Sequence, residues 1–123
     1  MVAEPDSAVV RAGLLGRLAQ DVGAGIVSDK IAYLTGDDLP ESPFYDRFEV
    51  LTVTNLRAKA ISTELRSRGA GSVEIKKRGA DINPDDLRKS LKLGGGGEQL
   101  TVIATRVDGR HRAIICRRLA KNL

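Results

Sequence analysis

Asp108 and Gly109 place the tightest constraint on how this chain can fold, because they lie between two apolar segments of strand type. An Asp-Gly pair readily adopts the positive φ angles of a two-residue turn whose twist matches that of antiparallel strands. The flanking segments are residues 98–106 and 110–117. We therefore predict an antiparallel β-hairpin at the C-terminal end of the chain.

Two earlier segments also have the composition of strands. Residues 48–53 are apolar and rich in β-branched side chains, which predicts a largely buried strand. Residues 72–76 alternate apolar and polar side chains, which predicts a strand with one buried face.

A helix is predicted after each of these two strands. The clearer one begins at Asn83, whose side chain can accept hydrogen bonds from the first turn, and Pro84 occupies the first helical position. Leu87 and Leu91 give this helix an apolar face. The other helix is predicted for about residues 56–68, with Asn55 as its cap, Ala58, Ile61 and Leu65 on one face, and Gly69 and Gly71 at its end.

The order of these elements is β-α-β-α-β-β. Strands joined through helices favour right-handed parallel crossovers, whereas the Asp108-Gly109 turn adds an antiparallel pair. We predict a small α/β (α+β) domain with a mixed sheet and helices on at least one face.

The segment before this domain is predicted to be a helical linker with a short hairpin. Asp6 or Ser7 can cap a helix, and Val10, Leu14 and Leu18 form one apolar stripe that ends before Gly23 and Gly25. Two short apolar pieces, residues 25–27 and 30–34, can pair through a turn at Ser28-Asp29. Residues 35–47 form a loop by composition, with two prolines and four acids.

Composition excludes several classes of protein. A chain of 123 residues supports one ordinary domain, and it contains no apolar run long enough to cross a membrane. One cysteine, Cys116, and one histidine, His111, exclude an internal disulfide framework and a Cys-rich or His-based metal site, and leave a Ser-His-Asp triad unsupported. With an acidic N-terminus that lacks the features of a secretory signal, these points favour a reducing, cytoplasmic setting. We expect Cys116 to be a small core residue and His111 to be exposed.

Charge is divided unevenly along the chain. Residues 1–56 hold four Lys/Arg and nine Asp/Glu, a net charge of −5, whereas residues 57–123 hold sixteen and seven, a net charge of +9. A basic half of this kind is typical of a surface that faces nucleic acid, although a solvated basic face remains an alternative.

Three strings in the basic half, residues 73–79 (VEIKKRG), 83–89 (NPDDLRK) and 100–106 (LTVIATR), closing with Gly109, resemble the THUMP-like domain. That domain forms the C-terminus of a group of bacterial class I S-adenosylmethionine-dependent methyltransferases. Residues 4–6 and 11–13, 31–37 and 42–44 resemble the segment that joins the methyltransferase core to it. The loop at 35–47 and the change in charge after it place the main boundary there, and with the resemblance we expect a linker over residues 1–46, a THUMP-like domain over 47–119 and a tail over 120–123.

The resemblance also implies a function. THUMP domains occur in tRNA-modifying enzymes and bind RNA, so we expect this chain to bind tRNA or rRNA and to present it to a catalytic domain in cis. The chain has no strand followed by a Gly-rich turn and a ribose-binding acid, so we expect no cofactor, no metal and no enzyme activity in this chain alone. S-adenosylmethionine is expected for the full-length enzyme. The alternative is a structural or protein-interaction module that docks on the methyltransferase core and does not bind RNA.

The candidate RNA-binding residues are all cationic, and each has a structural alternative. After the strand at 72–76, Lys76 and Arg78 should point to one side and Lys77 to the other, unless they only solubilise the strand end. Cations on the second helix could extend this surface, or could only face solvent and stabilise the helix dipole. The full set is Lys76, Lys77, Arg78, Arg88, Lys89, Lys92, Arg106, Arg110 and Arg112.

Three further features of the sequence could contribute to function. The glycines at 94–97 form either a flexible loop or a backbone approach to phosphate, and the loop is preferred. Arg117 and Arg118 follow the last strand and could also contact phosphate. All four aromatic residues lie in the acidic half, where they could pack the linker or form a docking surface for the catalytic core: Tyr33, Phe44, Tyr45 and Phe48.

Overall fold

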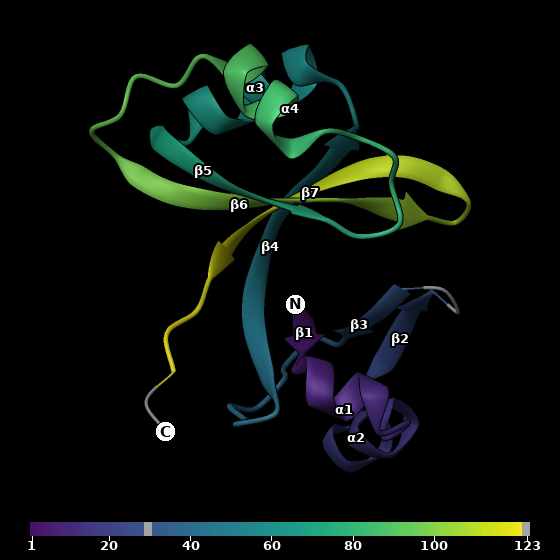
Figure 1. Ribbon diagram of the computed structural model, residues 1–123. Coiled ribbons are helices and arrows are strands. Elements are labelled where there is room, and N and C mark those ends of the chain that lie inside the picture. Colours follow the sequence, from purple (N-terminus) through teal and green to yellow (C-terminus); the bar gives the residue numbers. More distant parts are fainter. Residues whose placement is uncertain (29–30, 122–123) are drawn as a thin grey trace. The chain divides into compact units, whose positions relative to one another are not determined.

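The computed structural model describes residues 1–28 and 31–121 (Figure 1). The chain divides into two compact units, which are described separately. The first comprises Met1–Glu49 with Arg118–Leu123, and the second comprises Val50–Arg117. Among the described residues, none of the helices has the length and apolar character needed to cross a membrane.

The second unit is an α/β layer structure, which confirms the predicted fold class. Its strands lie in the order β4-β7-β6-β5, and its two helices cover one face of the sheet (Figure 1). The elements follow the predicted β-α-β-α-β-β order: β4 (Tyr45–Asn55, of which the second half belongs to this unit), α3 (Ala58–Ser67), β5 (Ala70–Lys77), α4 (Pro84–Leu91), β6 (Glu98–Val107) and β7 (Arg110–Arg118). Strands β5 and β6 are parallel, and β6 and β7 are antiparallel, so the sheet is mixed as expected.

Aliphatic side chains between the sheet and the helices form the core of the second unit. The predicted apolar faces are confirmed, since Ile61, Leu65 and Leu91 are fully buried from the helix side. From the strands, Leu100, Val102 and Ile115 are fully buried against them. Each such side chain stabilises the fold by about 1.5–3 kcal/mol relative to exposure.

Two local predictions are confirmed in detail. Asp108 and Gly109 have φ angles of 51° and 76°, as the two-residue hairpin turn requires. The Asn83 Oδ1 accepts hydrogen bonds from the backbone N–H groups of Asp85 and Asp86, at 3.0 and 3.1 Å, which caps α4.

Two other predictions for this unit are wrong. Asn55 does not cap α3, because it ends β4 and the helix begins only at Ala58, with Arg57 as an N-cap that makes no side-chain hydrogen bond there. The side chain of Asn55 instead accepts a hydrogen bond from Arg112. Strand β4 is longer than expected and only partly buried: Phe48 is buried, but Val53 is 50% exposed.

The glycine-rich segment 94–97 packs against the start of β5. The N–H of Gly95 donates to the carbonyl oxygen of Gly71 at 2.8 Å. A Cβ at Gly71 would lie 2.6 Å from the backbone nitrogen of Gly97, so only glycine allows this approach. A Cβ at Gly97 would lie 2.6 Å from the Gly69 carbonyl oxygen, so this backbone contact accounts for Gly71 and Gly97, whereas a Cβ at Gly94 would meet nothing within 4 Å.

The first unit contains a strand that the sequence did not predict. Strand β1 (Val2–Pro5) pairs antiparallel with both β3 (Ile31–Thr35) and β4. Its four residues are too few to show periodicity, and it ends at a proline. The predicted hairpin is confirmed by the antiparallel pairing of β2 (Gly25–Ser28) with β3, and its proposed turn includes Asp29, which lies outside the described residues.

The single N-terminal helix of the prediction is wrong. Two helices are present, α1 (Ser7–Arg11) and α2 (Leu15–Val22), separated by a turn in which Gly13 has a φ of 71°. Because of this break, Val10, Leu14 and Leu18 do not lie on one face of a single helix. Leu18 is buried, but Val10 and Leu14 are 40% and 51% exposed. The cap at Asp6 is confirmed, since its Oδ1 accepts from the N–H of Ala8 at 2.8 Å.

Three of the four aromatic side chains are buried within the first unit. Tyr33, Tyr45 and Phe48 are each no more than 3% exposed, whereas Phe44 is 54% exposed. The Tyr33 hydroxyl donates to the carboxylate of Glu4. An apolar docking surface that includes Tyr33 is therefore excluded.

Candidate nucleic-acid interface

The sheet register of the second unit brings two groups of predicted cations to one end of the sheet. In the parallel pairing of β5 with β6, Lys77 lies opposite Ala104, and the Arg78 N–H donates to the Ala104 carbonyl oxygen at 2.8 Å. The C-terminal end of β5 therefore lies beside the part of β6 that leads into the hairpin turn. Adjacent strands are about 4.8 Å apart, so Lys77 and Arg78 at the end of β5 lie near Arg106, which is two residues beyond Ala104 on β6.

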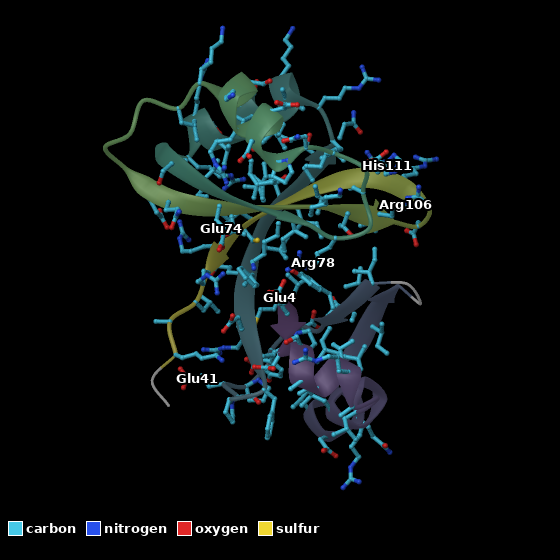
Figure 2. The ribbon with its side chains drawn as sticks, viewed as in Figure 1. Glu4, Glu41, Glu74, Arg78, Arg106 and His111 are labelled. Atoms are coloured by element: carbon cyan, nitrogen blue, oxygen red, sulfur yellow. The ribbon has the colours of Figure 1, made fainter. Side chains whose placement is uncertain are left out.

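The same register assigns the cations to the two faces of the sheet. Lys76 and Arg112 are on the face without helices. Lys76 pairs with Ile103 of β6, and Arg112 pairs with Thr105, which is on the same face of β6 as Ile103. Lys77 pairs with Ala104, on the face that α3 and α4 cover. Figure 2 shows Arg78 on the side of the sheet away from these helices. The expected division, with Lys76 and Arg78 on one side and Lys77 on the other, is confirmed.

The hairpin end carries cations on both faces. Arg106 and His111 lie directly opposite each other, and the Arg106 Nε donates to the His111 Nε2 at 3.1 Å (Figure 2). His111 is exposed, as predicted. Arg110 is exposed on the other face, beside the half-buried Arg112.

A hollow of about 340 Å³ lies next to this hairpin. It combines two aliphatic side chains with three charged ones: Val53, Val107, Asp108, Arg110 and Arg112. The hollow is not predictable from the sequence, because Val53 joins it only through the placement of β4 beside β7. The sequence predicts only a turn role for Asp108.

The cations of α4 lie apart from this end. Helix α4 runs from the end of β5 back to the start of β6, so its last turn is at the opposite end of the sheet. Arg88 pairs with Asp85 at 3.2 Å, and Lys92 closes the helix with a φ of 51°. Three cations of this region are exposed: Arg88, Lys89 and Lys92. Their positive charges near the C-terminal end of α4 interact favourably with the helix dipole. The nine predicted residues thus divide into six at the hairpin end of the sheet and three at α4.

Arg117 and Arg118 are engaged in ion pairs within the chain. Arg117 pairs with Glu98, and its hydrogen bond and charge hold the pKa of that carboxyl below its usual value. Arg118 pairs with Asp46 at 3.1 Å and lies 4.8 Å from the ring centroid of Phe48. Both arginines therefore have structural roles.

Cys116 lies in the core of the second unit. Cys116 is fully buried, and its Sγ donates to the Thr101 carbonyl oxygen at 3.5 Å, which confirms its core role. Within residues 1–28 and 31–121, no three His, Cys, Asp or Glu side chains are grouped in a way that could hold a metal ion.

Comparison with known proteins identifies relatives of this domain. Two proteins of Mycobacterium tuberculosis, from strains CDC 1551 and H37Rv, are 39% identical to it over 106 residues. Each is named an uncharacterized S-adenosylmethionine-dependent methyltransferase. The aligned region is 86% of this chain but only 29% of each relative.

The fold and the family are shown by two further matches. A crystal structure of a "putative methyltransferase" from Porphyromonas gingivalis W83 superposes with a TM-score of 0.70, over 97% of this chain and 29% of that one. At 21% identity, this likeness shows the fold alone. The family model described as THUMP domain-like matches residues 46–118. That match covers more than half of the sequence, and the chain belongs to the THUMP domain-like family.

Proposed function

We propose that this chain is the RNA-binding part of an S-adenosylmethionine-dependent RNA methyltransferase. In this proposal it binds tRNA or rRNA and presents it to a catalytic domain that lies outside residues 1–123. The methyl donor would be held by that catalytic domain.

The observation that supports RNA binding best is the group of exposed cations at the hairpin end of the second unit. Lys77, Arg106 and Arg110 are exposed there. Among residues 1–28 and 31–121, neither Lys77 nor Arg110 forms an ion pair with a carboxylate. Phosphate groups would satisfy these charges, and cations on both faces of one sheet end suit a backbone that passes around it.

The other candidates extend this surface in the proposal. Lys76, Arg78 and Arg112 lie at the same sheet end, on the face without helices. Arg88, Lys89 and Lys92 would contact RNA only if it also reaches the opposite end of the sheet. None of these surfaces contains an exposed aromatic side chain, so recognition would depend on backbone and shape rather than base stacking on aromatics.

One observation favours the alternative, a module that docks on the catalytic domain without RNA. Val10, Leu14 and Phe44 are large apolar side chains of the first unit, and each is at least 40% exposed. The N–H of Asp6 donates to the Phe44 carbonyl oxygen at 2.7 Å, which places Phe44 next to the start of α1. Exposed apolar side chains of this kind are typical of contact surfaces.

The proposal is tested by titrating the 123-residue chain with fluorescently labelled tRNA at salt concentrations from about 50 to 200 mM. We expect binding that weakens with salt. Replacing Lys77, Arg106 and Arg110 together with alanine should reduce the slope of log K against log salt by about one for each lost phosphate contact.

Charge-matched controls separate a local effect from net charge. Alanine at Arg11, Lys59 and Arg66 removes three exposed cations elsewhere and should leave the slope nearly unchanged. Alanine at Arg88, Lys89 and Lys92 shows whether the α4 group takes part. Absence of tRNA binding at low salt, or equal losses for the hairpin and control variants, would refute the proposal.

A further inference from the structure

The hollow beside the β6–β7 hairpin holds side chains that phosphate binding does not explain. Val53 and Val107 give it an apolar lining, and Asp108 adds a carboxylate between cations. A carboxylate at this position repels phosphate, so a surface built for phosphate alone gains nothing from it. The volume of the hollow, about 340 Å³, is in the range of sites for small ligands, roughly 300–1,000 Å³.

The hairpin turn does not require Asp at position 108. The φ of 51° at this position suits Asn equally well in a two-residue hairpin turn. Among the described residues, Asp108 forms no ion pair, although Arg110 and Arg112 line the same hollow. Both carboxylate oxygens are therefore available to accept hydrogen bonds from a ligand.

The two arginines differ in how firmly they are held. The Arg112 Nη1 donates to the Asn55 Oδ1, which fixes one edge of its planar guanidinium. A fixed guanidinium plane can stack on a nucleobase. Arg110 is exposed and can follow a phosphate. Stacking surface, apolar lining, acceptor and phosphate contact are thus adjacent.

We propose that this hollow binds a single unpaired nucleotide whose base is guanine, a proposal that rests on the RNA-binding function above. The Watson–Crick edge of guanine presents two neighbouring donors, N1–H and N2–H, which match the two oxygens of a carboxylate. Adenine and cytosine present one donor beside an acceptor nitrogen, and uracil presents one donor between two carbonyls. The guanine is unpaired, because pairing would occupy the edge that Asp108 contacts.

The test compares four RNA hairpins that differ only in one unpaired internal nucleotide, G, A, C or U, bound to the 123-residue chain. A bidentate contact discriminates against a wrong base by about 1–3 kcal/mol, which corresponds to roughly five- to 150-fold in Kd. We expect the G hairpin to bind at least fivefold more tightly. Asp108→Asn should remove this preference, and it should fold normally because Asn suits the turn.

Asp38→Asn is the matched control, because it removes the same charge from an exposed position of the first unit. This variant should keep the preference for G. If the four hairpins bind with salt-dependent but equal affinity, or if Asp108→Asn retains the preference, the guanine site is refuted while RNA binding stands. If no hairpin binds, both proposals fail. A short acidic peptide that displaces RNA and whose binding needs Arg110 would identify the hollow as a protein-binding site and overturn the proposal.

Discussion

Thr105 offers a sensitive test of the described packing, because its hydroxyl is buried without a hydrogen-bond partner. Thr105 is 1% exposed, and among residues 1–28 and 31–121 its Oγ1 has no hydrogen-bond partner. Thr101, four positions earlier on the same face of β6, is 3% exposed, and its Oγ1 donates to the Glu74 Oε1 at 3.1 Å. The pair allows one substitution, Thr→Val, to be compared in two environments.

The two substitutions should change the free energy of unfolding in opposite directions. An unsatisfied buried polar group costs about 1–3 kcal/mol, so Thr105→Val removes a cost and should stabilise the chain by about 1 kcal/mol. Thr101→Val loses a hydrogen bond to a charged acceptor and should destabilise it by about 1–2 kcal/mol. Thr and Val are both β-branched, so either substitution changes conformational entropy and strand propensity little.

Urea unfolding followed by circular dichroism measures both effects. If the slope against urea is the same for all three proteins, the difference in midpoint gives the change in stability. For a chain of this length, 1 kcal/mol corresponds to a shift of about 4 °C in Tm. If Thr105→Val destabilises the chain as much as Thr101→Val does, the Thr105 hydroxyl is hydrogen-bonded in solution and the description of this face is wrong.

Three further substitutions test other features of the fold. Gly71→Ala should destabilise the chain by about 1–3 kcal/mol, because its Cβ would lie 2.6 Å from the Gly97 nitrogen, whereas Gly94→Ala meets nothing within 4 Å and should be nearly neutral in urea unfolding. Asn83→Ala should cost about 1 kcal/mol in the same assay, since two N–H groups of α4 lose their acceptor, and Asn83→Asp should restore it. Burial raises the pKa of Asp46, but hydrogen bonds and charges from two cations outweigh burial and hold the pKa below its usual value. This stabilisation is present above the unfolded-state pKa of about 4 and is lost as the pH falls through the lower folded-state pKa, so Asp46→Asn should lose less stability than wild type in acid melts from about pH 5 to pH 2.

The fold of the second unit was largely predictable because its signals are local. The cap at Asn83 and the turn at Asp108-Gly109 each depend on a few adjacent residues, and both are confirmed. The cap assigned to Asn55 was wrong because α3 begins only at Ala58, and the Asn55 side chain accepts a hydrogen bond from Arg112, which is distant in sequence. In the first unit, β1 is stabilised by pairing with β3 and β4 rather than by its own four residues, so its sequence carried no periodic signal.

The candidate interface was predictable in residue type but not in arrangement. Strand alternation correctly placed Lys76 and Lys77 on opposite faces. The parallel crossover between β5 and β6 makes α4 return to the other end of the sheet, which separates Lys89 from the hairpin. Linear sequence could not show the hollow, because strand order places Val53 near Arg110 across nearly half the chain.

The most direct test of the account is to map the RNA contact on the 123-residue chain by NMR. Backbone amide shifts of ¹⁵N-labelled protein would be followed during titration with tRNA at low salt. The account predicts that the largest changes fall at residues 76–78 and 106–112, and that they reverse when salt is raised. Changes confined to the surroundings of Val10, Leu14 and Phe44, or no changes at all, would contradict it.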